Sequence, residues 1–295
     1  MIATFVIFLR EGIEAAMIVA VLMAYLRQIG HREYFRYLFL GVLAAFVLMI
    51  IGGVTAFITI RDYSGSRTQM IFETSTYLVA AFILTYMTFW MRSHSRSIST
   101  ELKKRAQFAL GEQVDSDEKL SQKAKWSLGL LAFQSVGREG LETMVFTLAI
   151  FFASKGPAPI RSGIIGGIGG LLVALIIANF VYRLGQKLNF KLFFQVMGAL
   201  LMVFAAGLLV DSVQNLQQLH WLPILTHPLW NTNSFLPQSS TLGGIIHSFF
   251  GYSSQPTLLQ VLTYVIYLSI TLGIFLGVGR NRLIIRKNEK TQLEI

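Results

Sequence analysis

The chain has 295 residues, of which 54% are hydrophobic and only 14% are charged. Soluble domains carry roughly 25% charged residues, so this composition predicts a membrane protein. The absence of cysteine excludes disulfides, thiolate metal sites and cysteine nucleophiles. The net charge of +10 is typical of basic cytoplasmic loops, and we expect membrane lipid rather than nucleic acid as a partner.

Long apolar runs predict an all-α membrane protein. A helix needs about 20 mostly apolar residues to span a bilayer. The runs are continuous and lack the alternating pattern of a membrane β-barrel. We therefore expect seven transmembrane helices, at 3–26, 38–60, 70–91, 127–153, 162–182, 192–213 and 257–279.

The basic residues predict the orientation of these spans. Outside the motifs described below, one side of the predicted membrane holds only Arg61, Arg67, Lys155 and Arg161. The other Lys and Arg residues lie in loops on the opposite side. Because cytoplasmic loops are enriched in Lys and Arg, we expect the N-terminus outside and the C-terminus in the cytoplasm. The expected location is the cell (inner) membrane, crossed several times.

Two short charged motifs interrupt the first and fourth apolar runs, at 10–14 and 138–142. Both have the pattern Arg-Glu-Gly-x-Glu. At about 100° per residue, the arginine and both glutamates of each copy share one helix face, near the middle of the span. The motif glycine lies off this face, where it permits either close helix packing or a local break. We expect the carboxylates to face one another between two antiparallel helices: Glu11, Glu14, Glu139 and Glu142.

The recurrence of the motif indicates an internal repeat. Three spans per repeat is an odd number, so the second copy enters the membrane inverted, as in secondary transporters whose substrate site lies between the repeats. The chain is then one transmembrane domain, 1–295, with two inverted three-helix repeats and one extra helix. Its predicted parts are repeat one at 1–91, a cytoplasmic connector at 92–125, repeat two at 126–213, an extracytoplasmic segment at 214–256, the seventh helix at 257–279 and a cytoplasmic tail at 280–295.

The carboxylates supply oxygen-only ligands for a hard cation. Glu73, near the outer end of the third span, adds a fifth carboxylate, whereas Arg10 and Arg138 are the only positive charges at hand. Carboxylates buried at this density largely protonate unless a cation is present. Oxygen ligands suit iron in either common oxidation state, Mn²⁺, Mg²⁺ or Ca²⁺. A structural interpretation remains open for one glutamate of each motif, which its arginine would neutralise.

Two segments outside the spans are distinctive. The charged stretch 92–125 favours a solvated connector at the lipid headgroups, with a short surface helix over 99–110 as the alternative. That helix would carry Leu102 and Ala106 on one side. The segment 214–256 has no Lys, Arg, Asp or Glu, and we expect it to lie in the headgroups or to re-enter the protein. Its histidines are predicted to be interfacial rather than metal ligands.

The paired motifs, placed in the first and fourth of seven spans, resemble those of the high-affinity iron permease family. This family includes fungal oxidase-dependent permeases and bacterial Efe-type permeases, and the segment 227–252 is similar to the bacterial branch. The resemblance implies that the motif glutamates bind and translocate iron. It also implies extracytoplasmic partners, which are a ferroxidase in fungi and an iron-binding protein with a haem peroxidase in bacteria.

We therefore predict an iron permease rather than an enzyme, with no catalytic residues and no permanently bound cofactor. Its metal ligands would be the four motif glutamates and Glu73, with Arg10 and Arg138 as supporting charges. The alternatives are a transporter of another divalent cation or a cation/proton exchanger. An iron sensor and an intramembrane enzyme are more remote, since the sequence offers no credible nucleophile for the latter. Oxygen ligands alone do not distinguish Fe²⁺ from Fe³⁺ as the substrate.

Overall fold

The computed structural model of the chain describes residues 1–62, 65–94, 98–110, 118–153, 157–184, 190–238 and 240–276. Their regular secondary structure is helical, apart from one isolated antiparallel bridge between Pro228 and Thr257. This confirms the all-α class. The predicted tail at 280–295 lies outside the described residues.

Long helices occupy the seven predicted positions. They are α1 (Ile2–Gln28), α2 (Phe35–Asp62), α3 (Arg67–His94), α5 (Glu118–Ala153), α6 (Pro157–Leu184), α7 (Phe190–Gln218) and α9 (Leu258–Leu276). Two shorter helices are α4 (Ile98–Leu110) and α8 (Thr241–Phe250), and one turn of 3-10 helix, η1, covers Arg32–Tyr34.

Five of the long helices are apolar enough to cross a membrane: α2, α3, α6, α7 and α9. Helices α1 and α5 have 27 and 36 residues and are therefore long enough to cross. Each carries the three charged residues of a motif, which lower its hydropathy. The crossing of the membrane by these two helices, and the orientation of the termini, stay predictions.

The chain divides into two compact units. The first comprises Met1–Phe72 and Ser93–Lys191, and the second comprises Glu73–Arg92 and Leu192–Ile295. The first two helices of each predicted repeat, together with α4, thus belong to the first unit. The second unit contains α8, α9, nearly all of α7 and most of α3, so the third helix of each repeat contributes to it.

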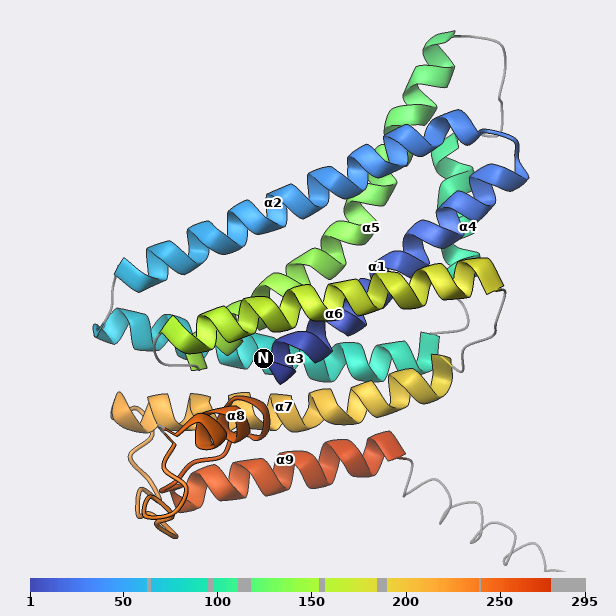
Figure 1. Ribbon diagram of the computed structural model, residues 1–295. Coiled ribbons are helices and arrows are strands. Elements are labelled where there is room, and N and C mark those ends of the chain that lie inside the picture. Colours follow the sequence, from blue (N-terminus) through green and yellow to red (C-terminus); the bar gives the residue numbers. More distant parts are fainter. Residues whose placement is uncertain are drawn as a thin grey trace, which may run out of the picture. The chain divides into compact units, whose positions relative to one another are not determined.

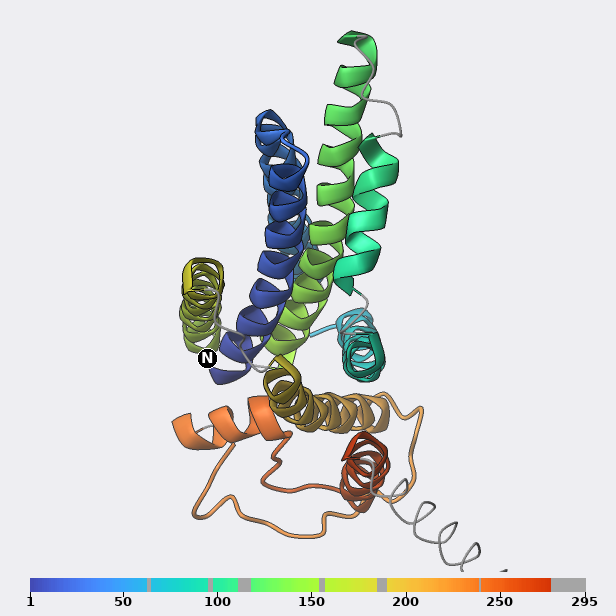
Figure 2. The same ribbon diagram turned by 90° about the vertical axis from the view of Figure 1, so that its right-hand side faces the viewer.

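Within the first unit, helices pair across the predicted repeats. Helix α1 packs along α6 and α2 packs along α5, whereas the consecutive helices α1 and α2, or α5 and α6, touch little (Figures 1 and 2). Glycines bring the paired backbones together: a Cβ atom on Gly41 would lie 2.1 Å from the carbonyl oxygen of Gly129, and one on Gly170 would lie 2.4 Å from that of Phe5. Small residues allow such close approach of helices in a bilayer.

The helix directions follow from the same contacts. Met1 lies beside Gly166 and Gly12 beside Ala174, so α1 and α6 run parallel. Gly41 lies beside Gly129 and the ring of Phe57 contacts that of Phe151, so α2 and α5 also run parallel. Because α1 and α2 run in opposite directions, α1 and α5 are antiparallel (Figure 1). The two motif helices therefore have the relative direction that the sequence predicts.

The favoured interpretation of 92–125 as a solvated connector is wrong for its helical part. Residues 98–110 form α4, which lies against α1 and α5 (Figure 2). Leu102 and Ala106 are buried in a core with Leu22 of α1 and Leu128 of α5. This apolar pair, spaced by four residues, lies on one face of α4, and the fold buries that face.

The segment between α7 and α9 folds back onto its own unit. Helix α8 ends at Phe250 and is capped by Gly251, and a Cβ atom on Gly207 would lie only 2.8 Å from the Gly251 nitrogen. Gly207 lies near the centre of the apolar stretch Gln195–Gln218 of α7. Of the two expectations for this segment, re-entry into the protein is therefore the one that the structure supports.

The glycine contact between α2 and α5 gives a first prediction. Gly41→Ala places a methyl group against a backbone oxygen that cannot move aside, so we expect a loss of about 1–3 kcal/mol in the stability of the purified protein. Thermal unfolding in detergent measures this loss. Gly273→Ala in α9 is the matched control, since its Cβ would meet no atom within 4 Å. Equal melting temperatures for the two variants would contradict the close α2–α5 packing.

Candidate metal site

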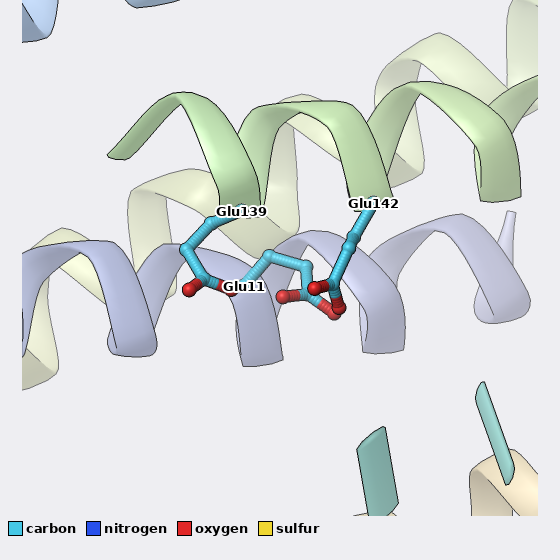
Figure 3. A group of neighbouring side chains, drawn as sticks. All are labelled: Glu11, Glu139 and Glu142. Atoms are coloured by element: carbon cyan, nitrogen blue, oxygen red, sulfur yellow. The ribbon is translucent and has the colours of Figure 1, made fainter. Parts of the chain in front are cut away.

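The two motifs meet where α1 and α5 cross. Glu11 of α1 and Glu139 and Glu142 of α5 each offer a carboxylate oxygen, and these atoms all lie within 4.8 Å of one another (Figure 3). All three residues are buried. Metal ions such as Zn²⁺ bind carboxylate oxygens at about 2.0–2.2 Å, so ligands on opposite sides of an ion are about 4.0–4.4 Å apart. Rotation of these side chains would bring the three oxygens into one coordination shell.

Each motif also contains an internal ion pair. Arg10 Nε donates a hydrogen bond to Glu14 Oε1 at 2.9 Å, and Arg138 Nε donates one to Glu142 Oε1 at 3.2 Å. Each motif thus contains the i,i+4 ion pair on which the structural interpretation of one of its glutamates depends. Glu14 is buried and paired with Arg10. Glu142 pairs with Arg138 and also contributes an oxygen to the cluster of three carboxylates.

Several buried atoms of the two motifs have no hydrogen-bond partner. They are both carboxylate oxygens of Glu11, Oε2 of Glu139, Oε2 of Glu142 and the two Nη atoms of Arg10. Glu11 has an ion-pair contact instead, with Arg10 Nη1 at 3.4 Å. A buried carboxylate without hydrogen bonds carries a large desolvation penalty. The four motif carboxylates outnumber the two guanidinium groups, so a bound hard cation would supply the missing charge.

The two arginines occupy different environments. The side chain of Arg10 is 3% exposed, whereas that of Arg138 is 45% exposed. Arg10 also lies close enough to Glu139 and Glu142 to act on both electrostatically across the helix pair. Arg10 is therefore the central positive charge of the group, and Arg138 lies at its edge.

The motif glycines serve close packing rather than a break, because α1 and α5 continue without interruption through them. A Cβ atom on Gly12 would lie 2.8 Å from Ala174 of α6, and one on Gly140 would lie 2.7 Å from Met49 of α2. Each glycine thus seats its motif against the second helix of the other repeat, on the side away from the carboxylates.

Glu73 is not among the carboxylates that the first unit brings together, because it belongs to the second unit. Its role as a metal ligand stays a prediction. The second unit also contains a buried acid that the sequence reasoning missed, Asp211 of α7. It lies within the predicted span 192–213, and the rule that ionisable residues inside spans are functional by default would have identified it.

Comparison with known proteins identifies the relatives of this chain. The model of the iron permease FTR1 family matches residues 1–286. The chain belongs to this family. The family's members are transporters rather than enzymes, and they carry iron as a substrate rather than a cofactor. The resemblance inferred from the paired motifs is therefore confirmed.

Individual relatives are similar over almost their whole length. The ferrous iron permease EfeU of Yersinia pestis is 32% identical over 276 residues, which cover 93% of each chain. EfeU of Escherichia coli O157:H7 is 30% identical over 268 residues, which cover 91% of this chain and 92% of the relative. No solved structure matches the chain.

The difference between the two arginines of this permease gives a second prediction. Arg10→Gln leaves the buried Glu14 without its ion-pair partner, and we expect it to reduce stability by about 3–5 kcal/mol. Arg138→Gln also removes an ion-pair partner, but Glu142 still lies within electrostatic reach of Arg10, so we expect a smaller loss than for Arg10→Gln. Thermal unfolding of the two purified variants compares them directly. A larger loss for Arg138→Gln would contradict the central position of Arg10.

Proposed function

We propose that this permease imports ferrous iron across the cell (inner) membrane through a midplane site formed by Glu11, Glu139 and Glu142. The observation that carries the proposal is the convergence of these three buried carboxylates, several of whose oxygens have no hydrogen-bond partner. A divalent cation would supply the charge and the coordination that the site lacks. Glu14, paired with Arg10, flanks the site as a further carboxylate.

The proposed architecture is a seven-span protein with two inverted three-helix repeats and an extra helix, the N-terminus outside and the C-terminus in the cytoplasm. The exchange of partners between the repeats supports it, since α1 packs along α6 while the equivalent helix α5 packs along α2. The antiparallel course of α1 and α5 supports it as well (Figure 1). Inverted repeats of this kind place the substrate site where the repeats meet.

The same packing supports a mechanism for transport. Backbone-level contacts at glycines join α1 to α6 and α2 to α5, so each pair would move as a rigid body. The carboxylates lie between these two bodies, with Glu11 on one and Glu139 and Glu142 on the other. Movement of one pair against the other would separate the ligands and release the ion. A carboxylate that loses iron can take up a proton, which makes coupling to a proton gradient physically available.

The choice of ferrous over ferric iron rests on the relatives, which are named as ferrous iron permeases. We also propose that an extracytoplasmic iron-binding protein, with a haem peroxidase or ferroxidase, acts with the permease outside the membrane. Such partners would carry out any redox step, leaving the permease to move the ion. The competing function, transport of another divalent cation, requires the same carboxylates and differs in selectivity only.

The proposed site predicts the behaviour of glutamine variants. Glu11→Gln or Glu139→Gln removes one ligand and one buried negative charge, and should still insert and fold. Loss of a residue that only supports the metal ligands costs ~10–100-fold in metal affinity or activity. Loss of a ligand should reduce iron uptake by at least that factor. Uptake of labelled iron into cells, normalised to protein in the membrane, measures this. Glu33→Gln is the control, because its side chain is 59% exposed beside His31. Wild-type uptake in both motif variants would overturn the site.

The proposed substrate is tested with purified protein in liposomes. Ferrous iron under anaerobic conditions should be taken up and ferric citrate should not, with the rate increasing when the lumen is made alkaline relative to the outside. Excess Mn²⁺, Zn²⁺ and Mg²⁺ measures selectivity against the competing function. Uptake of ferric iron alone, or stronger competition by Mn²⁺ than by unlabelled Fe²⁺, would refute ferrous import.

A further inference from the structure

A second group of ionisable side chains lies where α8 meets α7. The C-terminal end of α8 is held against α7 by backbone contact, since a Cβ atom on Gly251 would lie 2.4 Å from the Cα atom of Gly207. This contact places His247 of α8 opposite Asp211 of α7, with its Nε2 atom 3.9 Å from Asp211 Oδ1. Asp211 is seven residues before the end of the apolar stretch Gln195–Gln218, or about 10 Å inside it.

The hydrogen bond on the other ring nitrogen orients the ring of His247. Nδ1 lies 2.8 Å from the backbone carbonyl oxygen of Tyr252. A carbonyl oxygen can only accept a hydrogen bond, so Nδ1 carries the proton. In the neutral imidazole Nε2 then has a lone pair, which is the form in which histidine binds metals. Metal-binding histidines commonly donate their other N–H to a backbone carbonyl in this way.

Nε2 thus faces a carboxylate oxygen of Asp211 at a distance too long for a hydrogen bond. The two side chains are only 11% and 10% exposed, so a cation held between them would be largely shielded from water. Metal–nitrogen and metal–oxygen distances of about 2.0–2.2 Å put ligands on opposite sides of an ion about 4.1 Å apart, so the 3.9 Å separation fits an ion bound to both from nearly opposite sides.

Two further polar side chains of the second unit lie near Asp211. Tyr77 of α3 lies within electrostatic reach of both Asp211 and Glu73. Asn215 lies one helical turn beyond Asp211 on α7, and its buried Nδ2 atom has no hydrogen-bond partner. Turning this amide by 180° would present its oxygen as a ligand. An imidazole with a carboxylate and an amide oxygen suits borderline divalent metals such as Fe²⁺ better than it suits Mg²⁺ or Ca²⁺.

We propose that His247 and Asp211 form a second divalent-cation site on the extracytoplasmic side of the permease, which captures Fe²⁺ before it reaches the motif glutamates. The side of the membrane and the identity of the ion rest on the proposed function. The binding chemistry rests only on the contacts within the second unit. This inference departs from the expectation that the histidines of this segment are interfacial, and the titration below decides between the two.

The test is a titration of the purified full-length protein with Co²⁺, a spectroscopic substitute for Fe²⁺. The protein carries Glu11→Gln and Glu142→Gln, so that the motif site is disabled. We expect one bound Co²⁺ per chain, with visible absorption bands that show a nitrogen ligand. Adding either Asp211→Asn or His247→Gln should weaken this binding at least tenfold. His227→Gln is the matched control, because His227 is an exposed histidine of the same segment.

The outcomes separate this inference from the proposed function. Unchanged Co²⁺ binding in both the Asp211→Asn and the His247→Gln proteins would overturn the second site, as would an absence of binding before either change. Asp211→Asn preserves the shape of the side chain, so its result stands even if His247→Gln fails to fold. In uptake assays on the otherwise wild-type chain, Asp211→Asn should raise the half-saturating Fe²⁺ concentration while maximal uptake persists. Normal uptake in the motif variants would refute the proposed function alone.

Discussion

The desolvation of carboxylates between α1 and α5 is the constraint on which the rest of the first unit depends. Moving one carboxylate from water into a protein interior costs several kcal/mol even after the structure relaxes. The arginine of each motif offsets this cost for one glutamate through an ion pair four residues away. The remaining excess of negative charge cannot be offset from within the motifs. The arrangement therefore suits a site that binds and releases a cation better than it suits a protein core that is neutral at all times.

The two motifs are alike in sequence but not in surroundings. Arg10 is enclosed and acts on glutamates of both helices, whereas Arg138 is nearly half exposed. A transporter built from inverted repeats must hold its two halves in different conformations at any moment, because symmetric halves would open to both sides or to neither. In a single conformation of such a transporter, we therefore expect the two equivalent arginines to be buried to different extents.

Apolar runs and the paired motifs were enough to predict the long helices and the meeting of Glu11 with Glu139 and Glu142. Which helices pack together was not predictable, because nothing in the spacing of Gly41 and Gly129 indicates that these residues touch. Helix α4 was misjudged because its many charges outweighed Leu102 and Ala106, which the fold buries together. The pairing of Asp211 with His247 joins a span to a distant short helix, so it depends on the re-entry of α8, for which the sequence has no periodic signal.

Affinity in a transport pathway has an upper limit, since an ion that binds too tightly does not leave. Four carboxylates around one divalent cation would hold it very strongly. The ion pairs of Glu14 and Glu142 oppose this, because a guanidinium competes with the metal for the same oxygens. In the proposed site Arg10 would therefore have two roles that follow from one position: it would stabilise the empty site and weaken the binding of the ion. The second role would explain why a proposed cation site contains a buried positive charge.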